Sequence, residues 1–258
     1  MAYWQDRHQA SQNALANKRR RELDRQIRKY YKNLSRQVIS EYEALYDKVL
    51  LKQAAGEVVS PATLYAMDKY WSMNAQLRKR LSKTNAKFEA MMSKIFEIVY
   101  WDSYKAINLQ GLEAFSTIND AAVRQVLNAV WAADGKSWSQ RIWQNTQLLQ
   151  QTLDEGLIQC VVTGKKTSQL KEVLQDRFNV SYSRADTLVR TEIAHIQTEA
   201  AKQRYTDYGI QQVEIWADED ERRCDVCGKL HQKKYPVGAA VPIPAHPNCR
   251  CCIVPVIE

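Results

Sequence analysis

The chain has 258 residues, of which 45% are hydrophobic and 26% are charged, as in a folded globular protein rather than a disordered one. Only eight Gly and six Pro occur, which favours long helices over an all-β sandwich, and no apolar run approaches the ~20 residues that cross a bilayer. The net charge of +8 is concentrated at one end, because residues 1–36 carry ten Lys and Arg against three acidic residues and the rest is nearly neutral.

Residues 18–50 are predicted to form one long amphipathic helix. Apolar residues recur there at spacings of three and four, and no Gly or Pro interrupts the pattern before Gly56. The apolar side packs either inside this chain, which is the interpretation that we favour, or against a helix of a partner.

The same helix carries the basic excess, for which two interpretations are kept. The cations form either an ordinary solvated helix face or a surface that contacts nucleic-acid phosphates or an acidic partner. A surplus of seven charges on one arm exceeds what solubility requires. The candidate contact residues are Lys18, Arg19, Arg20, Arg21, Arg25, Arg28, Lys29 and Lys32.

Further helices are predicted between residues 60 and 165. Ser60 and Pro61 form a helix start, since Ser caps and Pro suits the first helical position, and the pattern continues to Leu77. Residues 88–104 are apolar on nearly every side and are predicted to be the buried central helix of a bundle. Two more helices follow: one capped by Asn119 or Asp120 that runs through Trp131, and one from Ser137 or Ser139 to Gly164.

The last 90 or so residues, about the size of a small domain, are predicted to mix helices and strands. After a polar linker at residues 164–166, a short helix is expected over 167–178, and Ser183 is expected to open a second helix that ends at Gly209. The apolar period then changes to two, which predicts strands at residues 213–216, 234–237 and 252–256.

The predicted fold class is therefore mainly α. It comprises an N-terminal helical bundle with a long basic helix, and a small α+β C-terminal domain with a Cys/His zinc knuckle. The predicted segments are a basic helical arm (1–60), a helical body (61–165) and a C-terminal domain (166–258).

Five of the six cysteines and two of the four histidines lie between residues 218 and 255. Two Cys three residues apart, followed by a His-x-x-Cys-x-Cys cluster, have the ligand types and spacings of a structural zinc site. A sheet this small has little core of its own, so a metal would stabilise it. The candidate ligands are Cys224, Cys227, His246, Cys249 and Cys251, while His231 and Cys252 are less favoured.

Other interpretations of the cluster are disulfides or free thiols, and a catalytic zinc. Disulfides require an oxidising compartment, and the polar N-terminal residues 1–12 do not resemble a secretory signal. A catalytic zinc keeps an open position beside a base, and neither His-Glu-x-x-His nor His-x-Glu occurs here.

Charged residues of the predicted helix before the first strand form another candidate site. Glu192 and His195 are three residues apart and share a helix side, so they could form an acid–base pair. The interpretation that we favour has Arg190 and Glu192 holding the following strand and loop through charged hydrogen bonds.

The motifs of this segment occur in a definite order: Arg190-Thr191-Glu192, Gly209, the strand 213–216, Asp218, Arg223-Cys224-x-x-Cys227, Pro244 and His246-Pro247-Asn248-Cys249-Arg250-Cys251. That order resembles the phage head-morphogenesis family, the minor head proteins of the Mu F type, whose C-terminal domain ends in an Asn-Cys-Arg-Cys signature. The resemblance marks Arg190, Thr191 and Glu192 as a structural motif, and Cys249 and Cys251 as matches to the signature.

The resemblance implies a non-enzymatic minor head protein, made in the host cytoplasm and bound inside the capsid near the portal. It would assist head assembly and DNA packaging or ejection. The implied partners are the portal or scaffold protein, with the basic arm contacting one of these or the genome, and no membrane. Some family members carry a toxin or transferase domain after the Cys-rich unit, and none is expected here, because only six residues follow Cys252.

Two competing hypotheses come from other classes of protein. A zinc-dependent nuclease would need a metal with an open position and a base such as His231 or His195. A zinc-knuckle regulator that binds nucleic acid would show a salt-dependent affinity carried by residues 18–36.

Overall fold

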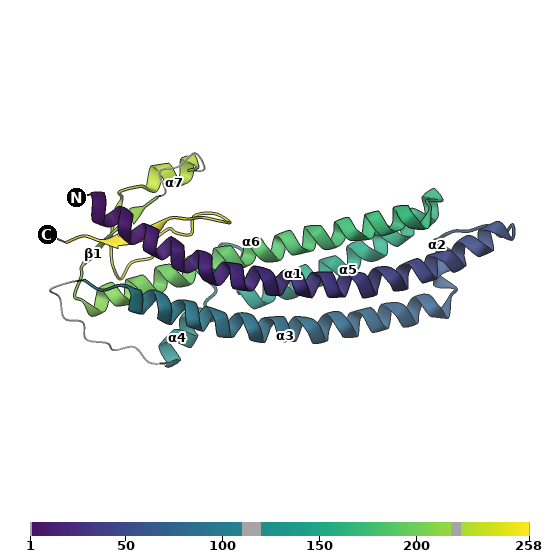
Figure 1. Ribbon diagram of the computed structural model, residues 1–258, viewed down its shortest axis with the longest axis horizontal. Helices are drawn as coiled ribbons and strands as arrows, with labels where there is room; N and C mark the ends of the chain where they lie inside the picture. The colour runs from purple at the N-terminus through teal and green to yellow at the C-terminus, as the bar shows by residue number, and fades with distance from the viewer. Residues whose placement is uncertain (1, 110–119, 218–222, 258) are drawn as a thin grey trace. The chain divides into compact units, whose positions relative to one another are not determined.

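The computed structural model describes residues 2–109, 120–217 and 223–257, which form helices and one three-stranded sheet (Figure 1). The helices are α1 (Ala2–Ala54), α2 (Pro61–Tyr65), α3 (Asp68–Ala106), α4 (Asp120–Leu127), α5 (Trp138–Thr163), α6 (Thr167–Asp207) and α7 (Asp225–Leu230). The strands are β1 (Gln212–Trp216), β2 (Lys234–Pro236) and β3 (Cys252–Pro255). The predicted fold class, mainly helical with a small C-terminal sheet, is confirmed.

Two of the expected features lie outside the described residues: Asn119 as a helix cap, and Asp218 in the series of motifs. Within the described ranges, no helix is both long and apolar enough to cross a membrane.

The chain divides into two compact units, each built from separate stretches of sequence. The sheet unit comprises Met1–Asp24, Met91–Trp138 and Thr187–Glu258, and the bundle unit comprises Arg25–Ala90 and Ser139–Asp186. Helices α1, α3 and α6 each contribute residues to both units. The division into an arm, a body and a C-terminal domain stays a prediction about sequence segments.

In the bundle unit the apolar stripe of α1 is buried inside the chain, as we expected. Ile27, Val38 and Leu45 are each at most 1% exposed. Tyrosines of the same stripe also bond to α5: the Tyr42 hydroxyl donates to Asp154 Oδ1 at 2.9 Å, and the Tyr46 hydroxyl donates to the Cys160 carbonyl at 2.9 Å. Burial of this stripe removes apolar area from water and holds α1 to α5.

The predicted helix from Ser60 to Leu77 is in fact two helices. Ser60 and Pro61 do begin α2, and Thr63 Oγ1 accepts a bond from the Ser60 N–H at 3.1 Å. The helix ends at Tyr65: Ala66 still donates to the Ala62 carbonyl, but the Met67 N–H donates to the Leu64 carbonyl, three residues back, at 3.0 Å. The Trp71 indole donates to the Tyr65 carbonyl at 2.8 Å. Helix α3 then starts at Asp68 and includes the predicted central segment 88–104.

Helix α4 also ends earlier than predicted, at Leu127 rather than near Trp131. The indole of Trp138, at the start of α5, donates to the Leu127 carbonyl at 2.8 Å and so satisfies a carbonyl that the helix leaves without a partner. At the other end of α5, Gly164 adopts a φ of 60°, the left-handed conformation expected at a helix end.

The prediction of two helices between residues 167 and 208 is wrong, because α6 runs unbroken over that range. Ser183 does not cap a helix start. Its hydroxyl donates to the Asn179 carbonyl at 3.0 Å, a bond that a serine inside a helix makes to the residue four positions earlier. No Gly or Pro lies between Thr167 and Asp207, and the helix ends just before Gly209, whose φ is 75°.

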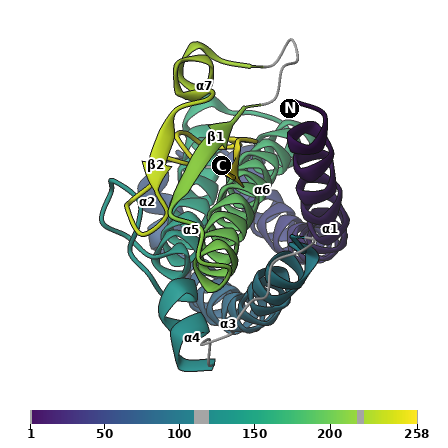
Figure 2. The ribbon, with the colours of Figure 1, turned by 90° about the vertical axis from the view of Figure 1, so that its left-hand side faces the viewer.

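The sheet has strand order β2-β1-β3 and is antiparallel throughout, which confirms the three predicted strands. Figure 2 shows β1 and β2 side by side. Ile215 pairs with Ile253, and both are at most 1% exposed because one face of the sheet is covered. The last turns of α6 supply part of that cover, since the Tyr205 hydroxyl donates to the Ile253 carbonyl at 3.3 Å. Cys227, Cys249 and Cys251 lie in the same apolar core.

Candidate metal centre

The first cysteine pair lies at the start of α7, a helix that the sequence did not predict. Cys224 is the N-cap of this helix, and its sulfur accepts a bond from the Cys227 N–H at 3.4 Å. The turn brings both sulfurs to one side, with Cys224 exposed and Cys227 buried. The two cysteines, with two residues between them, are therefore placed by the first turn of a helix rather than by an isolated loop.

The second cluster lies on the loop that leads into β3. The Cys249 N–H donates to the His246 carbonyl at 3.1 Å and closes a turn in which Asn248 adopts a φ of 62°. Asn tolerates this left-handed conformation better than most residues. The closed turn directs His246 and Cys249 toward α7, and Cys251 is buried beside them.

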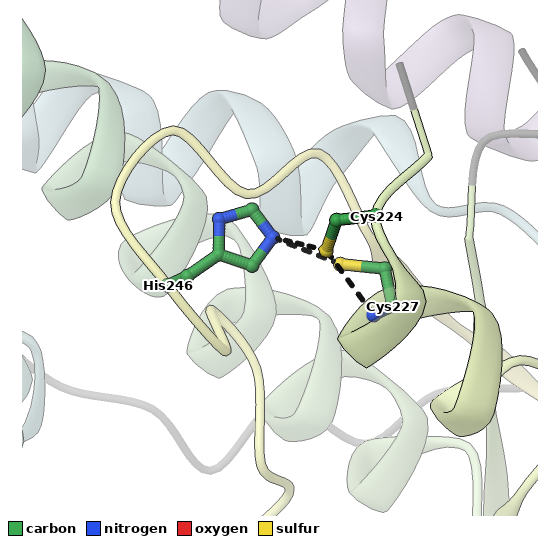
Figure 3. Close-up of side chains that lie close together, drawn as sticks. All are labelled: Cys224, Cys227 and His246. Atoms are coloured by element: carbon green, nitrogen blue, oxygen red, sulfur yellow. Dashed lines mark hydrogen bonds between the residues drawn. The ribbon is translucent and has the colours of Figure 1, made fainter. Parts of the chain in front are cut away.

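The five predicted ligands come together in two overlapping groups: Cys224, Cys227 and His246 form one, and Cys227, Cys249 and Cys251 form the other. Within each group the ligand atoms lie within 4.8 Å of one another. Figure 3 shows the ring of His246 directed at the two sulfurs of the first group, with Nε2 3.2 Å from Cys224 Sγ and 3.0 Å from Cys227 Sγ. Cys227 belongs to both groups and is therefore the centre of the cluster.

Three distances in the cluster can be compared with those of a tetrahedral zinc site. Zinc–sulfur bonds of about 2.3 Å place two sulfurs of a tetrahedron about 3.8 Å apart, and a sulfur and an imidazole nitrogen about 3.6 Å apart. The Cys227 and Cys249 sulfurs are separated by 3.8 Å. The two sulfur–nitrogen distances are a few tenths of an ångström shorter, so a bound ion would move His246 slightly outward.

A backbone contact also prepares His246 to act as a ligand. Its Nδ1 lies 2.8 Å from the Pro247 carbonyl, an acceptor that requires Nδ1 to carry the proton. The Nε2 lone pair is then free to bind an ion on the side where the sulfurs lie. Ligating histidines in metalloproteins use this same division of roles between the two ring nitrogens.

The pKa values of the thiols in the cluster are shifted in different directions. A hydrogen bond from the Cys251 thiol lowers the pKa of Cys249 to about 5, and the same bond raises the pKa of Cys251. Burial raises the pKa of Cys227 to about 12. The bond from the Cys227 backbone N–H lowers the pKa of Cys224. Cys249 and Cys224 therefore lose their protons most readily, whereas Cys227 keeps its proton until a metal ion displaces it.

His231 and Cys252 belong to neither group of the described cluster. The Ala217 N–H donates to His231 Nδ1 at 3.2 Å, and the imidazole lies against the ring of Trp216 with centroids 4.7 Å apart. Cys252 pairs with Trp216 across β1 and β3. Both residues therefore contact the end of β1 rather than the candidate metal site.

The Arg190-Thr191-Glu192 motif lies in α6 and connects three parts of the sheet unit. Thr191 Oγ1 accepts a bond from the Asn248 N–H at 3.1 Å and so anchors the loop of the second cluster. Glu192, buried, accepts a bond from the Trp131 indole at 2.9 Å. Arg190 lines a pocket next to the same loop. The contact between Thr191 and Asn248 could not be found in the sequence, because it joins residues 57 positions apart.

His195 is buried against an aromatic ring rather than placed at an open catalytic site. Its imidazole stacks on Trp131 with centroids 4.3 Å apart and an interplanar angle of 14°. Burial, with a smaller contribution from the charge of Lys202, lowers the pKa of His195 to about 4. The ring is therefore neutral at pH 7, and Glu192 is bonded to the same Trp131 that covers it.

The eight basic residues proposed as a contact surface do not all lie on the exposed side of α1. In the sheet unit, Lys18 and Arg21 are exposed. Arg19 instead donates to Asp102 Oδ2 through Nε at 3.0 Å and Nη2 at 2.6 Å, which raises the pKa of Arg19. Arg20 lines the pocket that also contains Arg190.

In the bundle unit the remaining four, Arg25, Arg28, Lys29 and Lys32, are exposed, as is Arg36. At 3.6 residues per turn, these five fall within a sector of about 100° on α1. The buried Ile27, Leu34 and Val38 lie on the opposite side. This set of five is called the basic face below.

Comparison with known protein families supports the resemblance found in the sequence. Residues 151–254 match the family model described as Phage Mu protein F like protein. The matched range begins within α5 and ends within β3, so it contains the Arg190-Thr191-Glu192 motif and all five candidate ligands. Searches of curated proteins and of solved structures found no match. The segment that carries the candidate metal centre belongs to the Mu F-like family of phage head proteins.

Proposed function

We propose that the chain is a minor head protein that binds near the portal inside the procapsid and assists head assembly and DNA packaging or ejection. The family match over residues 151–254 carries this proposal. The architecture supports it: the bundle unit supplies long helical surfaces suited to docking on a larger assembly. In this account the protein acts by binding, without catalysing a reaction.

The metal centre has a structural role in this proposal, with zinc bound by Cys224, Cys227, His246 and Cys249. The first three share one group, and the Cys249 sulfur lies at the separation from Cys227 that a tetrahedron requires. Cys249 is not part of the first group, so its loop would move closer to Cys224 and His246 on binding one ion. Cys251 then lies beside the ion as a donor to Cys249. Zinc would join α7 to the loop before β3, in addition to the apolar core that Cys227 of α7 shares with Ile243 of that loop.

A catalytic use of the same centre is less well supported by the surrounding residues. A metal-dependent nuclease needs a base beside an open position. His231 accepts a backbone bond at Nδ1, and His195 is buried under Trp131. A structural metal needs no such base, so the positions of His231 and His195 are compatible with it.

The portal proposal has a direct biochemical test. We expect the chain, co-expressed with the portal protein of its own phage, to co-purify with portal rings, and not with the major capsid protein used as matched bait. Portal rings that form normally without retaining the chain would contradict docking at the portal. Retention by the capsid protein alone would move the docking site to the shell.

We also propose that the basic face contacts genomic DNA without sequence specificity. Neutralising Arg25, Arg28 and Lys32 together to Gln removes three cations that can meet phosphates. If all three do so, the slope of log affinity against log salt falls by about 2.7, and affinity at low salt falls with it. Fluorescence anisotropy with a labelled duplex across a salt series measures both.

The control is a second triple variant in the same unit, Lys79, Lys83 and Lys87 to Gln, at exposed positions of α3. It removes the same charge and should leave the slope nearly unchanged. Equal losses in the two variants would show that DNA responds only to overall charge and that the basic face is no specific contact surface.

A further inference from the structure

A pocket beside the candidate metal centre is not explained by the structural role of the cysteines. It lies in the sheet unit between the N-terminal part of α1, the C-terminal half of α6 and the segment from Asn248 into the start of β3, and it has a volume of about 180 Å³. One water molecule needs only about 10–15 Å³ by this measure. The pocket therefore has room for a phosphate-sized group and several waters.

Three arginines line this pocket, each from a different segment: Arg20 from α1, Arg190 from α6 and Arg250 from the loop between two cluster cysteines. Among the described residues, no Asp or Glu lines it. Three guanidinium groups around one small volume create a strongly positive potential, which favours an anion.

On each of the two helices that line the pocket, the polar lining residues lie on one side of the helix. Asn13, Asn17 and Arg20 recur at spacings of four and three, so they share one side of α1. On α6, Arg190 and Gln197 are seven residues apart and lie on one side, with the small Ala194 between them. The arginines and amide side chains thus line the same space, and Arg20 Nη1 donates to Asn17 Oδ1 at 3.4 Å within this wall.

The wall also holds a polar atom without a partner. Gln197 Nε2 donates to the Gln12 backbone carbonyl at 3.1 Å, which fixes α6 to α1 within this unit. The side-chain oxygen of Gln12, which is buried, has no hydrogen-bond partner among the described residues. A buried acceptor of this kind is normally satisfied, so it suits a pocket that receives water or the hydroxyl of a ligand.

We propose that this pocket binds a phosphate group. A carboxylate has two oxygens in one plane and is satisfied by one or two guanidinium groups, whereas a phosphate offers oxygens in several directions. Arginines approaching from three segments match the second geometry. The phosphate comes either from a polynucleotide backbone or from a free phosphate or nucleotide.

This proposal rests on the proposed DNA contact and adds a second site to it. The two sites share no residue, because no member of the basic face lines the pocket. Metal binding would also affect this pocket. Arg250 lies between Cys249 and Cys251, and Asn248 is anchored to Thr191, so an ion bound by the cysteines would fix the loop side of the pocket.

The test is calorimetric titration of the full chain with pyrophosphate and with a 12-nucleotide single strand, at matched ionic strength. We expect saturable binding of at least one probe, weakened about tenfold or more by Arg190→Gln and by Arg20→Gln, since each removes charge-assisted hydrogen bonds. Arg20 is far in sequence from the cluster, so its variant tests the pocket without altering the loop. The control, Arg124→Gln, removes an exposed arginine of the same unit outside the pocket and should bind as the original does.

Metal content and melting temperature show whether each variant stays folded. Tight pyrophosphate binding identifies a free phosphate ligand, and binding of the single strand alone identifies a polynucleotide. No saturable binding of either probe, unaltered affinity in Arg20→Gln, or tighter binding of a glutamate-rich peptide would each overturn the proposal. None of these outcomes affects co-purification with the portal, which tests the head-protein proposal separately.

Discussion

Replacing Cys227 with Ser is expected to abolish zinc binding and to destabilise the sheet unit by about 4 kcal/mol or more. Structural zinc sites contribute their binding free energy directly to folding, so losing a central ligand has one of the largest effects available to a single substitution. Cys227 belongs to both ligand groups and is buried among apolar residues of the sheet unit. Hydrogen exchange of the β1 amides, which pair with β3, measures the loss locally.

The matched control is Cys252→Ser, the same chemical change at a half-buried cysteine outside both groups. It should retain zinc and change stability by no more than about 1 kcal/mol. Cys249→Ser should lose zinc and Cys251→Ser should retain it, if Cys249 is the fourth ligand. Unchanged zinc content and unchanged exchange in Cys227→Ser would contradict a structural metal.

Acidification is expected to destabilise the sheet unit through His195. Its pKa of about 4 in the folded chain lies below the unfolded value of about 6.5, so folding favours the neutral ring. The stabilisation is complete above pH 6.5 and is lost as the pH falls toward 4. Each pKa unit corresponds to 1.36 kcal/mol, which gives a loss of about 2 kcal/mol between pH 7 and pH 5.

Comparison with His195→Phe isolates this contribution, because acid also protonates the cysteine and histidine ligands. Phe keeps a flat ring against Trp131 but cannot be protonated. The original chain should lose about 2 kcal/mol more than the variant when chemical denaturation is repeated at pH 7 and pH 5. Identical pH dependence in the two proteins, or an imidazole pKa near 6.5 by NMR, would contradict the assignment.

Local patterns in the sequence predicted much of the fold, because they act between near neighbours. The apolar spacing of α1, the Ser60–Pro61 start of α2 and the change of period before β1 are all decided within a few residues. Ser183 shows the limit of such patterns. A serine followed by an acid three residues later also fits the interior of a helix, where its hydroxyl bonds to the carbonyl four residues earlier.

The candidate ligands could be predicted because their chemistry is specific, but the contacts that position them could not. Residue type and spacing were sufficient to select Cys224, Cys227 and the second cluster. The bond from Asn248 to Thr191 and the stacking of Trp131 on His195 join residues more than 50 positions apart. The pocket formed by α1, α6 and the cysteine loop likewise depends on tertiary packing, and no local pattern marks Arg20 as different from its basic neighbours.

A metal ion that joins α7 to the cysteine loop can be detected by native mass spectrometry of the full chain, purified under reducing conditions. We expect one zinc per chain in the original protein and none in Cys227→Ser. A metal-free chain at the fully reduced mass, or a mass lowered by disulfide formation among the same cysteines, would contradict it.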